Sequence, residues 1–214
     1  MGLTTPEWLQ LLQQNKVIAV IRSANMDLAY KMAHAVAAGG IKLIEITWNS
    51  QHPDKLVARL KQDLPNCVIG AGTILSEDCL HQAVLAGAQF AFAPNLNLGL
   101  LDAANLHQIP FVPGVFSPTE IVNAWEYGAK VVKVFPIKSL GGAEYIKCIQ
   151  APLKDVALIP TGGITIDNAK MMLDAGAIAV GISSGLFPQQ AIVQEDWSIV
   201  TDRTKYLLSR LDSK

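Results

Sequence analysis

Short apolar runs rich in valine and isoleucine recur along the chain, and the stretches between them carry apolar residues at helical spacing. The eight runs are 17–22 (VIAVIR), 41–47 (IKLIEIT), 67–74 (CVIGAGTI), 90–94 (FAFAP), 111–115 (FVPGV), 131–136 (VVKVFP), 157–163 (ALIPTGG) and 177–184 (AIAVGISS). Their starts lie about 20 to 27 residues apart, the room needed for a strand, a crossover helix and two short loops. This alternation predicts a parallel sheet covered by helices, and eight such units predict closure into a (β/α)8 TIM barrel.

A weak internal repeat supports this interpretation. Four of the predicted helices end in a glycine followed by a small residue, at 39–40, 87–88, 128–129 and 176–177, each before an even-numbered strand. A glycine in the left-handed conformation ends a helix at such a position. No linker or low-complexity stretch interrupts the series, so residues 1–214 are interpreted as one α/β domain.

The two ends of the chain are predicted to be helical. Thr5 is placed to cap an N-terminal helix, Pro6 suits its first position, and Trp8, Leu9 and Leu12 form an apolar stripe, which together predict an N-terminal capping helix. A last helix is expected over 197–211. Because the sequence contains no secretion signal pattern and no apolar segment of membrane-spanning length, we expect a cytoplasmic protein without a membrane partner.

Composition narrows the class of ligand. Half of the 214 residues are hydrophobic, 16% are charged, and the formal net charge of −1 provides no field that would gather nucleic acid or an anionic membrane. Cys67, Cys79 and Cys148 lack any CxxC spacing, which favours a reducing compartment and core packing, and the four histidines are too dispersed to predict a metal site. The expected partner is a small molecule.

In a parallel barrel the active site lies at the carboxyl ends of the strands, so polar residues late in the runs are the candidates. They are Arg22, Glu45, Thr47, Thr73, Lys133, Thr161, Ser183 and Ser184, with Pro94 and Pro136 ending two strands. Strand residues alternate between faces, so Glu45 and Thr47 share one face of the second strand, and Lys133 and Phe135 share one face of the sixth.

The second and sixth strands lie opposite each other in an eight-stranded barrel, so Glu45 and Lys133 could converge on one small molecule. A neutral lysine amine attacks a carbonyl carbon and forms an imine, and apolar surroundings favour the neutral amine. Glu45 would move the protons that imine formation and carbon deprotonation require. We expect the two groups to be bridged rather than tightly paired, although a purely structural buried ion pair is the alternative.

The third candidate feature is the pair of loops that follow the last two strands. PTGGI (160–164) ends the seventh strand and GISSG (181–185) ends the eighth. Barrels bind phosphate at this place with backbone N–H groups and a helix N-terminus. The loops therefore predict a site for phosphate or another small anion, the alternative being tight turns that only need small residues.

Six motifs in order resemble the 2-keto-3-deoxy-6-phosphogluconate (KDPG) and 4-hydroxy-2-oxoglutarate (KHG) aldolase family over nearly the whole chain. They are IEIT around Glu45, GAGT ending at Thr73, APN at Pro94, KVFP around Lys133, PTGG and GISS. The resemblance implies a homotrimeric (β/α)8 class I aldolase, needing no metal or other cofactor. Such an enzyme reversibly cleaves a 2-keto-4-hydroxy acid into pyruvate and an aldehyde, glyceraldehyde 3-phosphate or glyoxylate.

The same resemblance implies residue roles. Lys133 would form the Schiff base, and Glu45 would be the general acid and base. Thr73 would contact the pyruvate carboxylate, Pro94 and Phe135 would shape the pocket, and the distal phosphate or carboxylate would be bound by Gly162, Gly163 and Ser184. Thr47 and Thr161 join the substrate-binding candidates from their places at strand ends.

The chain departs from the family pattern at two positions. Well-known members have an arginine four residues after the glutamate where this chain has Asn49, and glycine where it has Asn95. Loss of a bidentate carboxylate clamp is not conservative. Because Arg22 ends the first strand, beside the second, we hypothesise that it supplies the missing cation. Lys138 and His52 are expected to be solvated loop residues.

Three alternatives remain at this level. The substrate could be the phosphogalactonate analogue of KDPG, which differs at one hydroxyl. The chain could instead be a phosphate-binding barrel that isomerises or condenses sugar phosphates without an imine, since glycine loops of the PTGG type are widespread on such folds. It could also be a non-catalytic metabolite-binding relative, an idea that rests only on Asn49.

Overall fold

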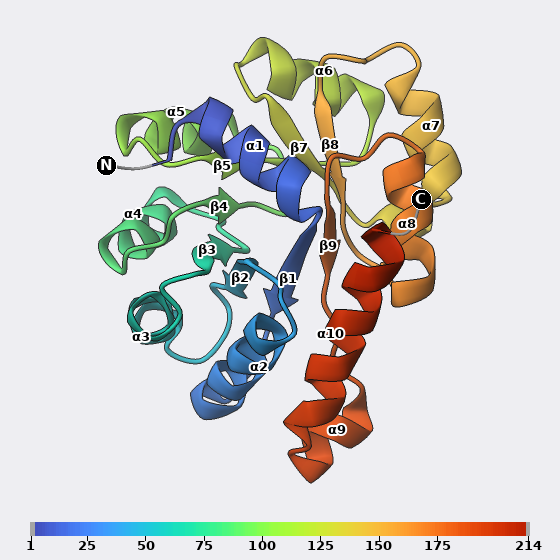
Figure 1. Cartoon of the computed structure of the whole chain (residues 1–214). Helices are drawn as coiled ribbons and strands as arrows, with labels where there is room; N and C mark the ends of the chain where they lie inside the picture. Colours follow the sequence, from blue (N-terminus) through green and yellow to red (C-terminus); the bar gives the residue numbers. More distant parts are fainter. Residues whose placement is uncertain (1–2, 213–214) are drawn as a thin grey trace.

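The computed structural model describes residues 3–212, in which a curled layer of parallel strands is surrounded by helices (Figure 1). The strands are β1 (Val17–Ile21), β2 (Leu43–Thr47), β3 (Val68–Gly72), β4 (Ala91–Phe92), β5 (Phe111–Val112), β6 (Gly114–Val115), β7 (Val131–Val134), β8 (Ala157–Pro160) and β9 (Val180–Ile182). Every one of the eight predicted runs contains a strand. The prediction of an α/β fold with parallel strands is confirmed.

The strands form two hydrogen-bonded groups. A six-stranded sheet has the order β5-β4-β3-β2-β1-β9, and a three-stranded sheet has the order β6-β7-β8. One isolated parallel bridge, between Thr161 and Gly181, joins the end of β8 to β9. The fifth predicted strand is divided into β5 and β6 at Pro113, because proline has no N–H to donate to a ladder.

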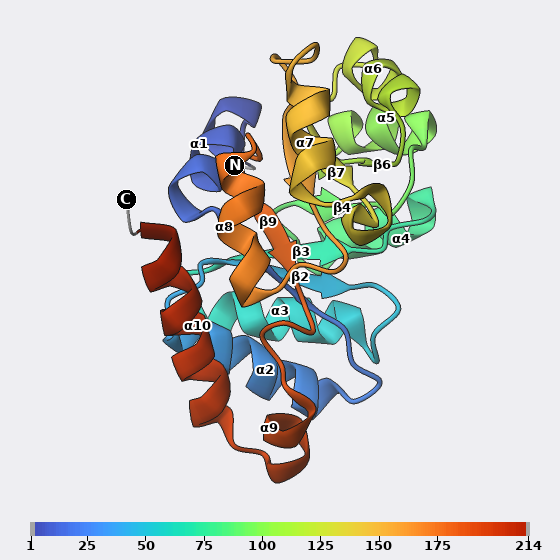
Figure 2. The ribbon, with the colours of Figure 1, turned by 90° about the vertical axis from the view of Figure 1, so that its right-hand side faces the viewer.

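The helices of the described chain are α1 (Thr5–Asn15), α2 (Met26–Ala38), α3 (Pro53–Asp63), α4 (Glu77–Leu85), α5 (Leu98–Leu106), α6 (Pro118–Glu126), the 3-10 helix η1 (Ile137–Leu140), α7 (Ala143–Gln150), α8 (Ile166–Asp174), α9 (Gln189–Gln194) and α10 (Trp197–Asp212). The predicted C-terminal helix is α10, and it lies against α2 and α8 (Figure 2). The predicted left-handed glycines are confirmed at Gly87, Gly128 and Gly176. In the first pair the prediction was one residue off, because Gly39 has φ −76° and Gly40 is the left-handed residue.

The start of α1 differs from the prediction by one residue. Thr4, not Thr5, is the N-cap: its hydroxyl accepts the Glu7 N–H, and the Glu7 carboxylate accepts the Thr4 N–H at 2.8 Å. Both threonines suit an N-cap, but only Thr4 has a glutamate three residues later, which completes a capping box. Pro6 lies in the first turn as expected.

Strand alternation separates two sets of apolar residues. One set, including Ile44, Ile46, Val132 and Val134, packs against the surrounding helices. The other lies on the opposite face of the strands, which we call the inner face. It contains Ile18, Leu43, Phe90, Phe92, Val112, Val131, Ile159 and Ala179, packed together with Trp8 and Leu12 of α1. Trp8 stacks on Phe90 with ring centroids 4.8 Å apart.

The cysteines only partly follow the prediction. All three are free thiols. Cys67 is buried, as expected, and burial raises the pKa of its thiol. Cys148 is exposed, so its assignment to the core was wrong, and Cys79 is half-buried. In residues 3–212 no helix is both long and apolar enough to cross a membrane.

Candidate active site

Lys133 and Glu45 lie on the inner face, one layer beyond the apolar cluster closed by Trp8. Leu43 belongs to that cluster, and Glu45 follows it by two residues on β2; Val131 and Lys133 have the same relation on β7. Because residues two apart on a strand share a face, the strand pattern directs both polar side chains inward. Both are almost fully buried, with side-chain exposures of 6% for Lys133 and 2% for Glu45.

The two charged groups face each other without forming a hydrogen bond. Lys133 Nζ lies 3.8 Å from Glu45 Oε1, within ion-pair range but beyond the usual hydrogen-bond distance of about 3 Å. Glu45 Oε1 is buried and has no hydrogen-bond partner among the described residues. A buried carboxylate oxygen without a donor is costly, so this atom is suited to accept a hydrogen bond from a water or a substrate group.

Glycine makes room for the Glu45 carboxylate. A Cβ atom built on Gly72 of β3 would overlap Glu45 Oε1 and Cδ. Gly72 is paired in register with Thr47, the next inner-face residue of β2. The glutamate side chain therefore occupies the space that a side chain at residue 72 would fill.

Two aromatic rings flank the lysine. Its Nζ lies 5.6 Å from the ring centroid of Phe92 and 5.3 Å from that of Phe135. Phe92 belongs to the apolar cluster below, whereas Phe135 follows β7 and is half-buried at the open side. The neighbours of the amine thus include two aromatic rings and the Glu45 carboxylate.

The loops after β1 and β2 are tied together beside the pair. Thr47 is buried, and its hydroxyl lies 3.1 Å from that of Ser50, which accepts the Ser23 N–H at 3.2 Å. Arg22 follows Ile18 and Val20 at the two-residue spacing of the inner face, and it is exposed. Its guanidinium group forms no hydrogen bond or ion pair with any residue of 3–212. Asn49 is also exposed. The structure thus leaves an unpaired guanidinium at the end of the strand next to β2.

Thr73 and Pro94 end the neighbouring strands. Thr73 has φ +58°, a left-handed conformation that is unfavourable for a β-branched residue. Such conformations persist where the surroundings hold them and concentrate at functional sites. Pro94 is half-buried, and a Cβ on Gly114 of β6 would overlap its carbonyl group, so close packing fixes this strand end.

The glycine loop after β8 is held on two sides. Thr161 is buried, and its carbonyl oxygen accepts the Ile137 N–H at 2.9 Å. Gly162 and Gly163 both have φ +87°, and a Cβ on Gly162 would lie 3.1 Å from the Phe135 ring. The amide of Asn168 donates to Gly163 O at 3.0 Å. The loop therefore adjoins the ring that flanks Lys133.

Ser184 is exposed in the loop after β9, whereas its neighbour Gly185 is half-buried. A Cβ on Gly185 would lie 3.0 Å from Ile164 O, so this loop packs beside the residue that follows Gly163. Arg203 of α10 donates from Nη2 to Gly185 O at 2.9 Å, while its Nε is buried without a partner in the described chain.

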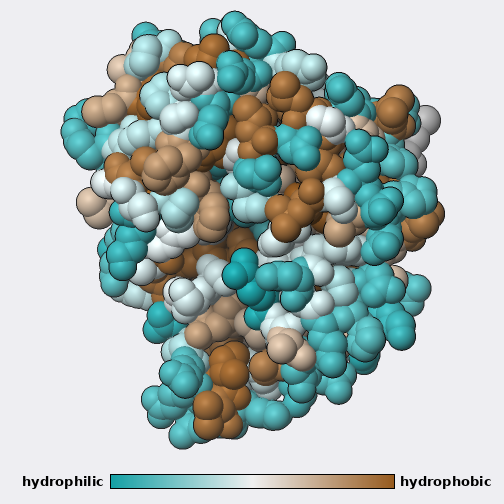
Figure 3. Space-filling model, turned by 180° about the vertical axis from the view of Figure 1, so that it is seen from behind, coloured by the Kyte–Doolittle hydropathy of each residue, from teal (hydrophilic) through white to brown (hydrophobic). Residues whose placement is uncertain are grey.

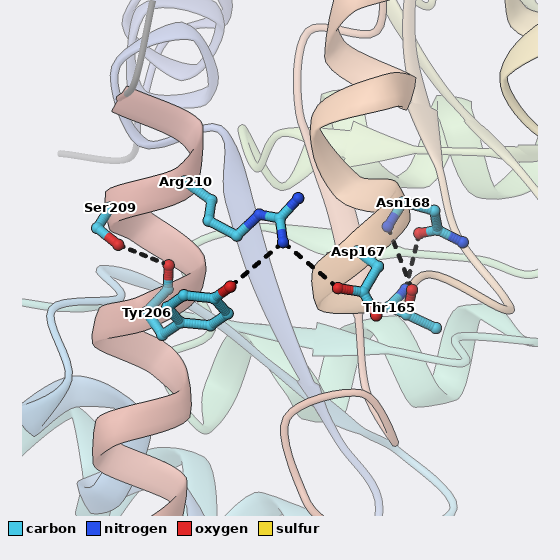
Figure 4. A network of polar contacts seen from close by, with 6 residues as sticks. All are labelled: Thr165, Asp167, Asn168, Tyr206, Ser209 and Arg210. Atoms are coloured by element: carbon cyan, nitrogen blue, oxygen red, sulfur yellow. Dashed lines mark hydrogen bonds and ion pairs between the residues drawn. The ribbon is translucent and has the colours of Figure 1, made fainter.

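Helix α10 also reaches the first turn of α8 (Figure 4). Arg210 Nη1 lies 3.5 Å from Asp167 Oδ1 and 3.3 Å from the Tyr206 hydroxyl. Beside it, Thr165 and Asn168 satisfy each other's backbone N–H groups in a reciprocal cap. The N-terminus of α8 is thus anchored next to the glycine loop, and its acidic residue is paired.

Within residues 3–212 no three histidine, cysteine, aspartate or glutamate side chains gather closely enough to hold a metal ion. The polar groups that the site does contain are the Lys133 amine, the Glu45 carboxylate and the backbone groups of the glycine loops. This set is suited to carbonyl chemistry by an amine and to binding of anionic ends.

The family model for KDPG and KHG aldolase matches residues 9–203. The chain belongs to the KDPG and KHG aldolase family. Members of this family similar to it include the 2-dehydro-3-deoxy-phosphogluconate aldolase of Treponema pallidum, 34% identical over 90% of this chain and 91% of that protein. The KHG/KDPG aldolase of Escherichia coli K12 is 32% identical over 89% and 90% of the two chains.

A solved aldolase structure agrees with the fold. KDPG aldolase from Legionella pneumophila, with pyruvate captured at low pH as a covalent carbinolamine intermediate, superposes with a TM-score of 0.86. The two sequences are 32% identical, and the match covers 93% of this chain and 97% of that one. The resemblance noted in the sequence is therefore confirmed at the level of the family.

Several residues that support the site were not singled out by the sequence pattern. Gly72 lies in the GAGT motif, but nothing local indicates that it makes room for Glu45. Asn168 stands three residues after Thr165, a spacing that indicates a helix cap and could have identified it. No local sequence pattern indicates that Arg203 binds the loop at Gly185. Lys138 and His52 are exposed, as expected for solvated loop residues, but Lys138 also packs on Gly163.

Proposed function

We propose that this chain is a class I aldolase that reversibly cleaves KDPG into pyruvate and glyceraldehyde 3-phosphate, or KHG into pyruvate and glyoxylate. As a member of the family it is an aldolase, and hence a lyase. The observation that carries the proposal is the buried Lys133 amine facing the unpartnered Glu45 oxygen at 3.8 Å. The covalent pyruvate adduct of the Legionella relative supports imine chemistry.

The proposed reaction follows from these two groups. The neutral amine of Lys133 attacks the C2 carbonyl carbon, a C–N bond forms, and the carbonyl oxygen leaves as water. The C4 hydroxyl then loses its proton, the C3–C4 bond breaks, and its electron pair forms an enamine as the aldehyde departs. Protonation of C3 and hydrolysis release pyruvate and restore the amine. Glu45 accepts and returns these protons, directly or through a water.

The two anionic ends of the substrate are assigned to opposite sides of Lys133. Arg22, Thr47 and Thr73 would bind the pyruvate carboxylate, with the unpaired Arg22 guanidinium replacing the cation absent at Asn49. The distal anion would lie at the glycine loop.

At that loop, Gly162, Gly163 and Ser184 would bind the distal anion, and Pro94, Phe135 and Thr161 would shape the pocket between the two ends. The contact of the loop with the Phe135 ring supports this placement.

The finer architecture is part of the same proposal. The bridge between Thr161 and Gly181, and the continuity of β5 and β6 across Pro113, support one (β/α)8 barrel over residues 1–214. Trp8 and Leu12 share one buried cluster with inner-face residues of β1, β2, β4, β5, β7 and β8, which supports α1 as the cap of the N-terminal end of the barrel.

A homotrimer and a cytoplasmic location remain predictions from the sequence. Exposed large apolar side chains, including Phe116, Trp125 and Tyr127 in and beside α6, are compatible with subunit contacts. Figure 3 shows apolar surface interspersed among polar residues on one face. Light scattering would give three times 23.0 kDa for the trimer. Metal independence is checked by unchanged activity after exhaustive dialysis against a chelator.

Reductive trapping tests the central proposal. The protein is incubated with pyruvate and borohydride, and peptides are mapped by mass spectrometry. A pyruvate-derived mass increase on the Lys133 peptide is expected, whereas Lys133→Met should give none and the exposed Lys42→Met should behave like the parent. Absence of the adduct from the parent protein would contradict imine catalysis. Cleavage rates with KDPG, KHG and the phosphogalactonate analogue then identify the preferred substrate.

A further inference from the structure

The 3-10 helix η1 places a lysine against the glycine loop. The Lys138 N–H donates to Gly162 O at 3.1 Å, next to the bond from the Ile137 N–H to Thr161 O. A Cβ built on Gly163 would lie 2.5 Å from Lys138 Cβ and 3.0 Å from its Cδ. The hydrocarbon stem of Lys138 therefore packs along Gly163, where a side chain would otherwise lie.

The ammonium group of Lys138 is not engaged elsewhere. It is exposed and forms no ion pair or hydrogen bond with any residue in 3–212. Lys31 and Lys170, by contrast, each have a carboxylate partner. The acidic residue in the adjacent first turn of α8, Asp167, is paired with Arg210 (Figure 4). The stem of Lys138 thus lies beside the loop, and its charge has no counter-ion among residues 3–212.

We propose that Lys138 is a further substrate-binding residue, which supplies the cation for the distal anion of the substrate and makes the site selective for a phosphate dianion. The inference rests on the proposed aldolase function and on the distal end lying at Gly162 and Gly163. A phosphate carries nearly two negative charges at neutral pH and three acceptor oxygens. It gains more from a nearby ammonium group than a single carboxylate or a neutral hydroxyl does.

The test compares cleavage of KDPG with cleavage of its dephosphorylated analogue by Lys138→Met, which keeps the stem length and removes the charge. We expect KM for KDPG to rise about two- to five-fold with kcat nearly unchanged, the range of an exposed ion pair. KM for the dephosphorylated analogue should not change, because that substrate lacks the charge with which Lys138 would pair. Lys138→Arg should restore the KDPG value, and added salt should reduce the difference between parent and variant.

Lys147→Met provides the matched control, because Lys147 is an exposed lysine on α7 whose ammonium group likewise forms no hydrogen bond or ion pair with the described residues. Lys138→Gln serves as a second variant if the methionine lowers solubility. An equal rise of KM for both substrates would mean that Lys138 only shapes the loop, and unchanged KM for KDPG would mean that it does not bind the anion. Either result overturns the inference.

The pyruvate and borohydride adduct separates this inference from the proposed function. If Lys133 is trapped in the parent and in Lys138→Met, the aldolase mechanism stands whatever happens to KM. If the parent itself gives no adduct and no cleavage, the proposed function fails, and the inference about Lys138 fails with it.

Discussion

Glu45 Oε1 lies 3.8 Å from Lys133 Nζ and receives no hydrogen bond from the described chain. A water or a substrate hydroxyl at about 2.8 Å from each atom could bridge the two groups. In a permanent structural ion pair, the buried carboxylate would be expected to have its lone pairs satisfied by protein donors. The separation therefore agrees better with a pair that acts through a shared proton carrier.

Glu45→Gln should preserve the shape of the site and remove the proton carrier. We expect kcat to fall about 10²- to 10⁴-fold, the usual contribution of a general acid or base. Steady-state kinetics and exchange of the pyruvate methyl protons in deuterated water measure the effect. Lys133 should still be trapped by pyruvate and borohydride, more slowly. Retention of the parental exchange rate would assign the proton transfers to another group.

Gly72→Ala should displace the Glu45 carboxylate, because the new methyl group would overlap Oε1. We expect a loss of about 1–3 kcal/mol in the free energy of unfolding from overpacking, together with a fall in kcat. Gly99→Ala in α5 is the control, since its neighbours stand at van der Waals distances of 3.4 and 3.6 Å. That helix substitution should be neutral or slightly stabilising. Full activity of Gly72→Ala would show that catalysis does not depend on the position of the Glu45 carboxylate.

Arg22→Gln should weaken binding of the keto acid. Loss of a charge-assisted contact to a carboxylate predicts a rise in KM of about ten-fold or more, with a smaller change in kcat. Arg22→Lys should recover only part of the loss, because an ammonium group cannot form the bidentate contact. Lys55→Gln, an exposed charge on α3, controls for net charge. An unchanged KM in Arg22→Gln would show that Arg22 does not replace the arginine that other family members have at the position of Asn49.

Trp8→Ala tests whether α1 closes the inner core. Trp8 is 2% exposed and packs on Phe90 and Phe92, so we expect a loss of about 3–5 kcal/mol in the free energy of unfolding. Where the variant remains folded, kcat should be close to that of the parent, because Trp8 lies one layer below the Lys133 pair. Leu85→Ala, at a highly exposed site, should change stability by less than about 0.5 kcal/mol. Equal effects of the two variants would argue against a cap.

The cap of α1 should respond to acid. Hydrogen bonds from the Thr4 N–H and hydroxyl lower the pKa of Glu7 from its ordinary value of 4.5. A lowered pKa means that the ionised carboxylate stabilises the fold above pH 4.5 and that this contribution is lost as pH falls through the lower folded-state value. In urea titrations, parent and Glu7→Gln should differ at neutral pH and converge in acid. A difference that grows in acid would contradict the assignment.

Much of the fold and the central pair could be read from local patterns. A strand repeats every two residues and a helix every 3.6, so the alternation in IKLIEIT and VVKVFP already indicated that Glu45 and Lys133 share the inner face. The glycine pairs likewise indicated where helices end, because the left-handed conformation is a local property of the backbone. Motif order across the chain then indicated the family.

Other features depend on distances between segments far apart in the sequence, which local patterns do not encode. The space that Gly72 leaves for Glu45, the contact of Lys138 with Gly163, and the bond from Arg203 to Gly185 arise only when the strands curl and the loops meet. The division of the fifth strand at Pro113 has the same origin, because a missing N–H matters only once a neighbouring strand needs it. Side-chain direction is thus a local property, whereas the identity of the partner it meets is set by packing.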